Sequence, residues 1–516
     1  MRILFFLAIL PFTLHINAQI TFNKRVHFGH PAAVMTGVIV TDSCYFATGI
    51  VADTLPPHKT GSVFSRISLE GEAVFHKVVT SPTKTYETWE DPVMTQDGGI
   101  LLVGNSYDSA TSCFFMKFNL SGDTVLFQDY PHPLAPWYAF MRPNGGVQLT
   151  NDGGFISCNS IHNGALSFDI YMVRADAAGA VVWDSVYKLP LLDLPRSMIP
   201  DGQGGFIIGS LTDDQQLVTQ NFVSQNHIFN IDGNGEVLWS YHSPDSAGLM
   251  GTVNDLVMLD DGSLIVATGI GTEIERPTGN TIWFEKLLYK LSPDHEIEWE
   301  RVFLNPGPQN SVADLNNVIG MSDGSGFIAA GIEGELGINS FTIRGFLAKV
   351  SPNGEVIWTR RYVGLDSEEP IHKVFDLHET PDGGIIMVGE SHDGTGDTYP
   401  RQQAWLLKLD QYGCLVPGCN LLDDVDETTK KPIGLIIYPN PTTDYLNFQL
   451  HNVGLLQKGT FRILDANGQL LRSFPSNGSA GDTFILPIWD WAAGVYFLQY
   501  VDGEKGVVVS EKFIKL

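Results

Sequence analysis

Four carboxylates in this sequence have the residue type and placement to do chemistry. Asp91, Asp255, Asp314 and Glu369 each lie near the start of a short apolar run. If those starts share one surface, a pair of carboxylates there could act as acid and base on a glycosidic bond. The sequence does not give their separation, and charged residues at strand starts usually form a solvated rim. A polysaccharide-acting enzyme is therefore an alternative, and we predict no catalytic residue.

Motifs for other chemistry are missing from the sequence. It contains no nucleophile elbow, phosphate-binding loop, zinc-type His pair or dinucleotide fingerprint. The segment 232–236 resembles part of a calcium loop, but it lacks the later bidentate Glu and reads as a hairpin turn. We predict neither a metal site nor a cofactor. The formal net charge of −27 repels phosphate and anionic lipid, which excludes nucleic acid and membrane surfaces as partners.

Aromatic and arginine side chains gather in three irregular segments, residues 130–144, 273–284 and 393–403. Rigid aromatic area combined with Arg suits recognition of an extracellular glycan or protein. The alternative is that these residues only cover the ends of strands. The candidate binding residues are His132, Trp137, Tyr138, Arg142, Arg276, Trp283, Tyr399 and Arg401.

A repeat of about sixty residues must position these groups. Each copy has an apolar strand, an Asp-Gly turn, a second strand, a variable stretch, and then two strands joined by a turn such as Ser-Pro-Asn-Gly. Asp-Gly and Asn-Gly turns supply the positive φ that tight hairpins need. Four-stranded units stacked around an axis bury both faces, which predicts an all-β fold, a seven-bladed β-propeller over residues 19–420. The copies begin at Asp42, Asp97, Asp152, Asp201, Asp261, Asp323 and Asp382.

The two faces of such a ring differ. Turns between first and second strands and between third and fourth are short and uniform, whereas the other connections are long and irregular. We assign binding to the face with the long connections, since rigid scaffolds tolerate variation there. Tryptophans at positions 183, 239, 299 and 358 suggest sugar stacking, but they recur at one repeat position, which favours packing between units.

The last unit lacks its fourth strand. Residues 20–26 resemble the fourth strand at 356–362, so we predict that the N-terminal strand completes the last unit as its outer edge. Cys414 and Cys419 flank a short turn and are expected to form a disulfide. Cys44, Cys113 and Cys158 fall in apolar strands and are expected to be buried.

The chain ends carry export features. Arg2, an apolar run over residues 3–14 and the small-residue pattern ending at Ala18 predict a signal peptide over residues 1–18. No later segment is long enough for a transmembrane helix. Residues 421–433 form a polar linker. Beyond it, seven short alternating segments in residues 434–516 predict a small Ig-like β-sandwich.

The C-terminal motifs are specific. Tyr-Pro-Asn-Pro-Thr at 438–442, Asp-Ala-Asn-Gly at 465–468, Gly-Val-Tyr-Phe-Leu at 494–498 and the terminal Lys-Phe-Ile-Lys-Leu together resemble the type IX secretion C-terminal sorting domain. An unrelated accessory sandwich is the alternative. The residues that carry the resemblance are Pro439, Asn440, Pro441, Gly468, Gly494, Tyr496 and Lys515.

The resemblance implies export through the type IX secretion machinery. It implies passage across the outer membrane with this domain as address, frequent removal of the domain, and attachment to surface lipopolysaccharide. The linker is the expected cleavage region. The first 420 residues also resemble secreted propellers built from Asp-Gly-Gly repeats, which gives a fold but no substrate.

The leading prediction for function is a secreted or cell-surface binding or adhesion protein without enzymatic activity. The alternatives are the polysaccharide-acting enzyme described above and a structural surface component. The ligand cannot be named from these residues.

Overall fold

The computed structural model describes most of the chain beyond residue 18, and every regular helix or strand among the described residues is a β-strand. This confirms the all-β prediction. The segments outside the description are residues 1–18, 54–58, 90, 108–110, 132–137, 140–145, 163–167, 189–191, 214–223, 245–248, 275–280, 304–310, 337–340, 365–369, 394–401, 417–418, 420–433, 439, 444, 452–458, 477–482 and 503–505. The predicted signal peptide and linker lie in these segments.

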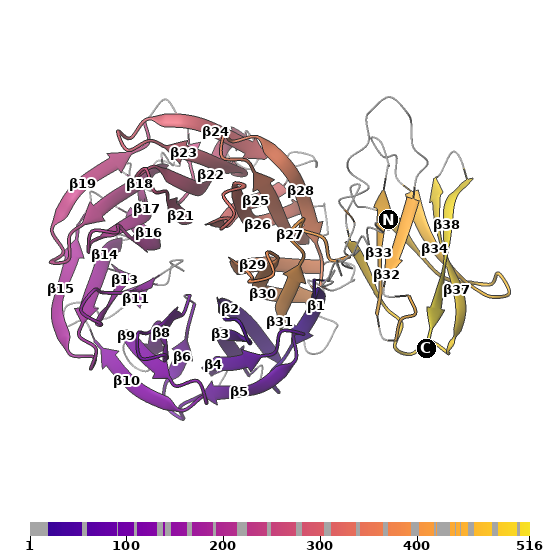
Figure 1. Ribbon diagram of the computed structural model, residues 1–516, viewed down its shortest axis with the longest axis horizontal. Helices are drawn as coiled ribbons and strands as arrows, with labels where there is room; N and C mark the ends of the chain where they lie inside the picture. The colour runs from indigo at the N-terminus through magenta and orange to yellow at the C-terminus, as the bar shows by residue number, and fades with distance from the viewer. Residues whose placement is uncertain are drawn as a thin grey trace, which may run out of the picture.

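The first part of the chain forms successive antiparallel units around a common centre (Figure 1). The first unit is β2 (Ala32–Val40), β3 (Tyr45–Ala52), β4 (Thr60–Ile67) and β5 (Ala73–Val79). The second is β6 (Thr85–Glu87), β7 (Val93–Met94), β8 (Ile100–Tyr107), β9 (Thr111–Phe118) and β10 (Thr124–Tyr130). The third is β11 (Tyr138–Ala139), β12 (Val147–Leu149), β13 (Phe155–His162), β14 (Phe168–Ala175) and β15 (Val181–Tyr187).

The next units repeat the same pairing. One is β16 (Leu192–Pro200), β17 (Phe206–Asp213), β18 (Ser224–Ile231) and β19 (Val237–His242). Its successor is β20 (Leu249–Met250), β21 (Asp255–Met258), β22 (Leu264–Ile274), β23 (Thr281–Leu291) and β24 (Ile297–Phe303). Then follow β25 (Ser311–Gly320), β26 (Phe327–Leu336), β27 (Phe341–Val350) and β28 (Val356–Tyr362).

The final unit closes the ring by combining the first strand of the chain with three strands that come about 350 residues later. It contains β29 (Pro370–Glu379), β30 (Ile385–Asp393) and β31 (Gln402–Leu409), and β1 (Phe22–Val26) pairs with β31 as its outer strand. The register runs from Phe22 opposite Lys408 to Val26 opposite Ala404. This confirms the predicted closing strand.

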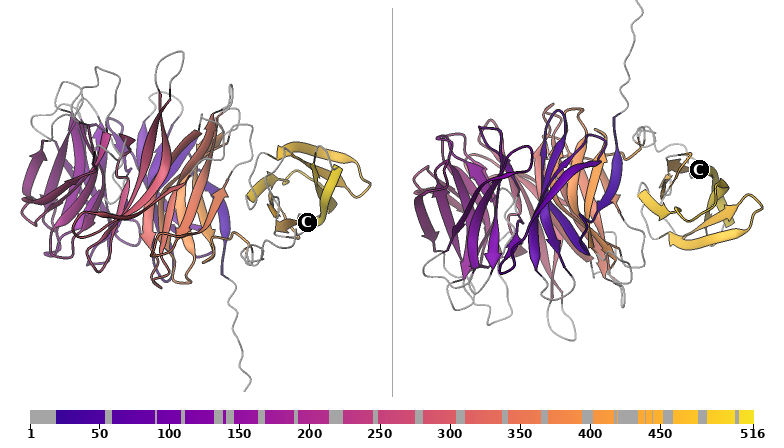
Figure 2. Two further views of the ribbon diagram at one scale, coloured as in Figure 1. Left: turned by 90° about the horizontal axis from the view of Figure 1, so that it is seen from above. Right: turned by 90° about the horizontal axis from the view of Figure 1, so that it is seen from below.

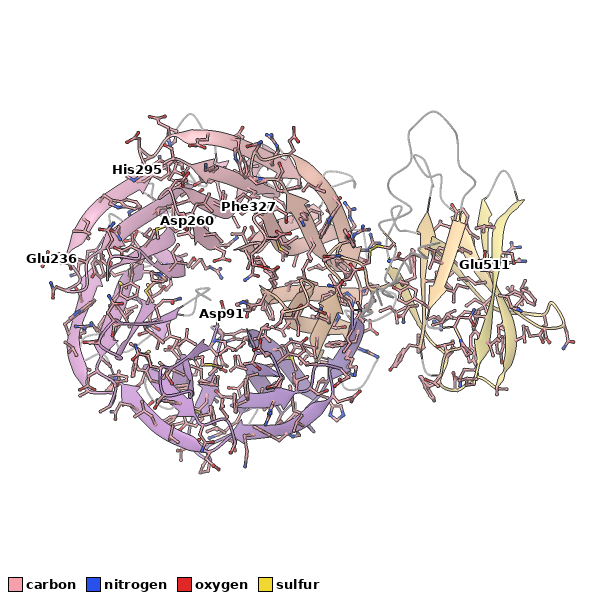
Figure 3. The ribbon with its side chains drawn as sticks, in the orientation of Figure 1. Asp91, Glu236, Asp260, His295, Phe327 and Glu511 are labelled. Atoms are coloured by element: carbon pink, nitrogen blue, oxygen red, sulfur yellow. A yellow bond between two sulfur atoms is a disulfide. The ribbon has the colours of Figure 1, made fainter. Side chains whose placement is uncertain are left out.

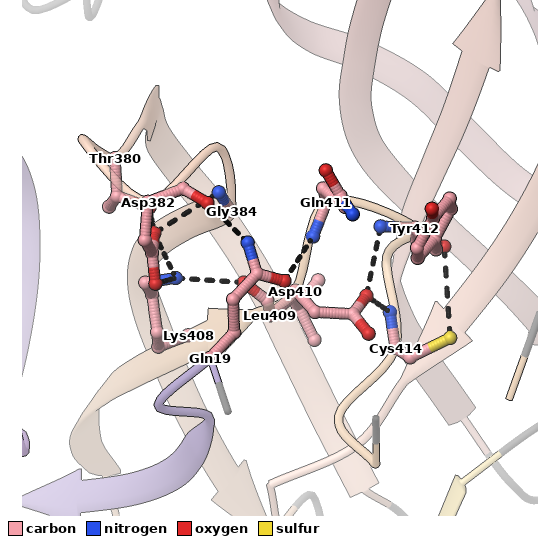
Figure 4. Close-up of polar contacts among 10 residues, drawn as sticks. All are labelled: Gln19, Thr380, Asp382, Gly384, Lys408, Leu409, Asp410, Gln411, Tyr412 and Cys414. Atoms are coloured by element: carbon pink, nitrogen blue, oxygen red, sulfur yellow. Dashed lines mark hydrogen bonds and ion pairs between the residues drawn. The ribbon is translucent and has the colours of Figure 1, made fainter. Parts of the chain in front are cut away.

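Side chains next to β1 reinforce the closure. Figure 4 shows Gln19, whose amide Nε2 donates to the carbonyl of Asp382 and whose Oε1 accepts from the main-chain N–H of Gln411 at 3.1 Å. The hydroxyl of Thr21 donates to the carbonyl of Leu415 at 2.6 Å. The N-terminal segment is therefore bound to the turn between β29 and β30 and to the segment that follows β31.

Cys414 and Cys419 form the predicted disulfide just beyond the last unit, with Cα atoms 5.7 Å apart. Cys44, Cys113 and Cys158 are buried, as predicted, and none of the three forms a disulfide. They pack as small apolar groups in the cores between strands.

The apolar core is divided among the junctions between neighbouring units. One cluster joins Ile265 and Leu288 of one unit to Ala329 and Phe346 of the next. Within a unit, glycine in the second strand allows a close approach to the inner strand, because a Cβ on Gly331 would lie 1.9 Å from the carbonyl oxygen of Asp314. The inner strand β25 has its register shift beside that contact.

Three of the recurring tryptophans pack between units, as the sequence predicts. Trp299 and Trp358 lie against Gly354 and Gly413 in the next unit's turn, and the indole N–H of Trp183 donates to the carbonyl of Gly233 at 3.2 Å. Their rings close the outer rim of each junction.

The C-terminal part is a separate pair of antiparallel sheets (Figure 2). One contains β32 (Gly434–Tyr438), β33 (Tyr445–His451) and β36 (Thr483–Pro487). The other contains β34 (Gly459–Asp465), β35 (Leu470–Ser476), β37 (Gly494–Asp502) and β38 (Gly506–Lys515). Phe448 and Leu450 from the first sheet share a core with Phe461, Leu498 and Phe513 from the second.

Candidate functional site

Most of the predicted loop residues lie outside the described residues. His132, Trp137, Arg142, Arg276, Tyr399, Arg401 and the carboxylate candidate Glu369 all do so. For two others only the backbone is placed: Tyr138 begins β11 opposite Ile161, and Trp283 lies in β23 opposite Thr272. The proposed binding face therefore stays a prediction.

The carboxylates predicted near the inner strands are held by the main chain. Asp255 on β21 accepts from the N–H groups of Leu256 and Val318, each at 2.8 Å, and from the hydroxyl of Ser197 at 3.1 Å. Val318 belongs to the next unit, so this carboxylate joins two units. The repeat-related Asp376 on β29 does the same by accepting from the N–H of Val38 at 2.7 Å.

The other two described candidates also take part in junctions. Asp314 accepts from the side-chain amide of Asn254, in the preceding unit, at 2.8 Å. Asp91 lies near the centre of the ring in Figure 3, and its main chain meets Gly37 of the preceding unit, where a Cβ would lie 2.9 Å from the Asp91 Cα. These residues bind unit to unit, a structural role that the sequence interpretation did not include.

Burial shifts the protonation of this inner group. Desolvation raises the pKa of Asp255 to about 7, because it outweighs the lowering of the pKa by the hydrogen-bond donors. Desolvation also raises the pKa of Asp314 to about 6. Burial lowers the pKa of His378, but the Asp376 carboxylate 3.4 Å from its Nε2 outweighs this and the net pKa lies above its usual value. Asp255 and Asp314 therefore keep a proton at a higher pH than an exposed carboxyl group does.

The raised pKa of Asp255 predicts a pH-dependent stability. The folded protein holds this proton at a pH where the unfolded chain has released it, so the contribution to stability is complete below about pH 4 and is lost as pH rises through about 7. Replacing Asp255 with Asn should flatten the stability profile between about pH 4 and pH 7 by a few kcal/mol, measured by urea unfolding. The exposed Asp260→Asn variant serves as control and should keep the wild-type slope; an unchanged slope in Asp255→Asn would contradict the assignment.

A buried ion cluster lies between two units and was not predicted. The Lys286 ammonium is 2.9 Å from a Glu333 carboxylate oxygen, and the Arg361 guanidinium binds the same carboxylate at 2.5 Å and 3.2 Å. Lys286 is fully buried and also lies over the ring of Phe346, 4.7 Å from its centroid. Burial opposes ionisation of Glu333, yet the two cations hold its pKa below the usual value.

The C-terminal motif residues meet at the last strand. The Asn440 side chain donates to the carbonyl of Lys512 at 2.9 Å and accepts from the N–H of Ile514 at 3.0 Å. The Thr442 N–H donates to the carbonyl of Ile514 at 2.8 Å, and the Leu516 N–H donates to the carbonyl of Thr442 at 2.9 Å. We call this set of contacts the terminal clamp. It fixes the chain end to a segment about seventy residues earlier.

The remaining motif residues surround the clamp strand or form turns. Gly494 pairs with Lys515 in the register of β37 and β38, and the ring of Tyr496 stacks on Phe513 at 5.4 Å. Gly468 adopts φ of 80° in the β34–β35 turn. Pro441 follows Asn440 through a cis peptide bond, and Pro439 lies outside the described residues.

Residues 436–516 match the family model described as the secretion system C-terminal sorting domain. This part of the chain resembles the sorting domain of type IX secretion. The match confirms the resemblance drawn from the Tyr-Pro-Asn-Pro-Thr and terminal Lys-Phe-Ile-Lys-Leu motifs. A protein with this sorting domain is secreted or displayed at the outer-membrane surface, and it uses the type IX machinery.

Solved structures resemble the chain only distantly. PorZ, a surface component of the type IX secretion system of Porphyromonas gingivalis, has 11% identity and a TM-score of 0.32, with 93% of this chain and 70% of PorZ covered. An ulvan lyase has 8% identity and a TM-score of 0.45, covering 78% of this chain and 100% of the lyase. An α-L-arabinofuranosidase from Fusarium graminearum has 10% identity and a TM-score of 0.39, covering 63% and 93%.

No curated protein matches the sequence. Among all described residues of the chain, no helix is long and apolar enough to cross a membrane.

Proposed function

We propose that this protein is an extracellular binding protein without enzymatic activity. In this proposal a seven-bladed β-propeller at residues 19–420 presents the ligand site, a linker follows at 421–433, and an Ig-like sandwich at 434–516 directs export. The observation that carries the proposal is that the inner carboxylates connect neighbouring units. Asp255 and Asp376 each accept a main-chain N–H of the next unit, so they serve the scaffold and leave binding to the long connections.

The ligand under this proposal is an extracellular glycan or protein. The candidate loop residues combine aromatic rings with arginine, which supply rigid contact area and directional donors. The test uses the uncleaved chain, residues 19–516, on an array of polysaccharides and glycoproteins, with the double variant Trp137→Ala/Tyr138→Ala beside it. A specific signal that the double variant loses supports the proposal, while the exposed Trp489→Ala variant of the sorting domain is the control and should bind as wild type.

Two results would contradict the binding proposal. An array on which the wild-type chain binds nothing would favour a structural surface component. Release of oligosaccharide from a polysaccharide, abolished by Asp255→Asn, would instead favour the enzyme alternative.

For export, we propose that the secretion machinery recognises the folded terminal clamp. Residues 1–18 then act as signal peptide, and cleavage in the linker frees the mature protein for release or attachment to surface lipopolysaccharide. Asn440 supports this role because its single side chain satisfies both a donor and an acceptor of β38.

The clamp predicts a secretion defect from one substitution. Asn440→Ala removes both side-chain hydrogen bonds to the terminal strand, and we expect the protein to accumulate in the periplasm, measured by fractionation and immunoblotting. Ser473→Ala, an exposed residue of β35 in the same domain, is the matched control and should be exported normally. Normal surface delivery of Asn440→Ala would contradict recognition through the clamp.

A further inference from the structure

One junction departs from the repeat at the third strand. In other units a Lys or Arg there reaches the Asp of the Asp-Gly turn: Lys117 lies 2.6 Å from Asp97, Arg174 lies 2.6 Å from Asp152, and Lys408 lies 3.0 Å from Asp382. In the unit of β16–β19 the same register position, opposite Ile207, is Asn230. Its amide Nδ2 donates to Asp201 Oδ2 at 3.1 Å.

Because Asn230 is neutral and shorter than Lys or Arg, it leaves Asp201 without a cationic partner at this position and leaves more space beside it. Asp201 Oδ1 already accepts the main-chain N–H groups of Gln203 and Gly205, each at 2.8 Å. With the Asn230 amide on the other oxygen, three neutral donors stabilise the carboxylate. A carboxylate oxygen can accept more than one hydrogen bond, so Asp201 retains acceptor capacity.

A second departure lies across the same junction, in the turn between β23 and β24. The other described units have glycine there with positive φ, such as Gly354 at 80° and Gly413 at 70°. This unit has His295 at φ of 64°, a conformation that costs a non-glycine residue about 1 kcal/mol. Strained residues of this kind persist where the surroundings or a function require them.

His295 changes how the neighbouring tryptophan packs. In the next junction Trp299 lies so close to Gly354 that a Cβ there would be 2.6 Å from the indole ring. At His295 the imidazole instead packs against Trp239, with ring centroids 4.5 Å apart. The tryptophan therefore lies against an aromatic side chain where its counterpart lies on bare backbone. Figure 3 shows His295 at the outer part of the ring, beside β19.

Both departures border one cavity of about 290 Å³. It opens between the two units on the face of the short turns, opposite the face with the long connections. Polar and apolar groups from both units line it: Asp201, Asn230 and Trp239 come from the unit of β16–β19, and Met258, Leu264 and His295 come from the next unit. The repeat is thus altered at two independent positions, and both alterations line the same space.

We propose that this cavity binds a neutral sugar residue of an extracellular glycan. The indole of Trp239 offers a face for the C–H groups of a pyranose ring, and the adjacent carboxylate and amide of Asp201 and Asn230 suit neighbouring hydroxyls, which both donate and accept. An anionic sugar would be repelled by Asp201. A metal cation is disfavoured because Asp201 supplies the one carboxylate among the lining residues.

This site is distinct from the proposed ligand face. Trp239 also packs between the two units, as predicted, against the core that they share and against His295. The site needs none of the loop residues named for that face. Its position on the short-turn face was not predicted, because those turns were treated as uniform. The signal was the absence of glycine at position 295 and of Lys or Arg at position 230 in an otherwise regular repeat.

The test restores the repeat. Asn230→Lys should pair with Asp201 and fill the cavity, and His295→Gly should relieve the positive φ, so both variants should fold at least as well as the wild type. Saturation-transfer NMR measures sugar binding to the uncleaved chain, residues 19–516. The probes are the methyl glycosides of glucose, galactose, mannose and N-acetylglucosamine at millimolar concentration. We expect binding of at least one probe, weakened about tenfold or more in each variant.

The matched control is Lys117→Asn, which makes the same exchange in another unit and should leave sugar binding unchanged. Equal affinity in wild type, Asn230→Lys and His295→Gly would overturn the proposal, as would the absence of binding to all four probes. Binding of tetramethylammonium in place of sugars would overturn the ligand class. Binding lost only in Trp137→Ala/Tyr138→Ala would overturn this site while supporting the proposed ligand face.

Discussion

Deleting residues 19–28 should lower the melting temperature by more than about 10 °C, because the last unit loses its outer strand. The deletion removes the five paired residues of β1 and exposes the edge of β31. It also removes Phe22 and Phe28, which are 8% and 6% exposed. Burial of each phenylalanine contributes about 1.5–3 kcal/mol, so the loss exceeds that of an ordinary point substitution.

Thermal unfolding followed by circular dichroism measures this effect, with a deletion of equal length inside the 421–433 linker as the control. The control should melt with the wild type. A synthetic peptide of residues 19–28 added to the deleted protein should restore part of the stability by pairing with β31. Coincident melting of the deletion variant and the wild type would contradict the closing role of β1.

Replacing Glu333 with Ala should destabilise the ring by about 3–5 kcal/mol, because the Lys286 ammonium would remain buried without its carboxylate. Arg361 loses the same partner but lies closer to solvent. The free energy of unfolding in guanidinium chloride measures the effect. Glu300→Ala removes an exposed carboxylate from β24 and should change stability by less than about 0.5 kcal/mol.

A second variant separates charge from packing. In Glu333→Ala/Lys286→Met the buried ammonium is gone, and part of the lost stability should return because no unpaired charge remains in the core. A single Glu333→Ala variant as stable as the wild type would show that the cluster contributes little. A double variant less stable than the single one would show that Lys286 acts through its packing on Phe346.

The parts of this structure that follow from local rules could be predicted from the sequence. The closing strand was found because residues 20–26 repeat the alternation of 356–362, and the disulfide because Cys414 and Cys419 flank a short turn. The seven alternating segments predicted in residues 434–516 correspond to the seven strands β32 to β38 of the described residues.

The contacts between units could not be predicted in the same way. Asp255 and Asp314 were placed correctly near inner strands, but their partners Val318 and Asn254 belong to neighbouring units, and only the ring geometry brings them together. The Lys286–Glu333–Arg361 cluster joins residues whose spacing in the sequence follows no recognisable pattern. Single charges inside apolar strands give no indication of which opposite charge will meet them.

The pairing of β1 with β31 also sets the order in which the chain can fold. The indole N–H of Trp405 donates to the Asn23 side chain across 382 positions of sequence, so this contact cannot form until nearly the whole ring has left the ribosome or the translocon. Its loop-closure entropy is compensated only by completion of the circle, a topology that favours slow folding. Until β31 is in place, the first strand has no partner for its backbone, and the incomplete ring exposes strand edges that can pair with other chains.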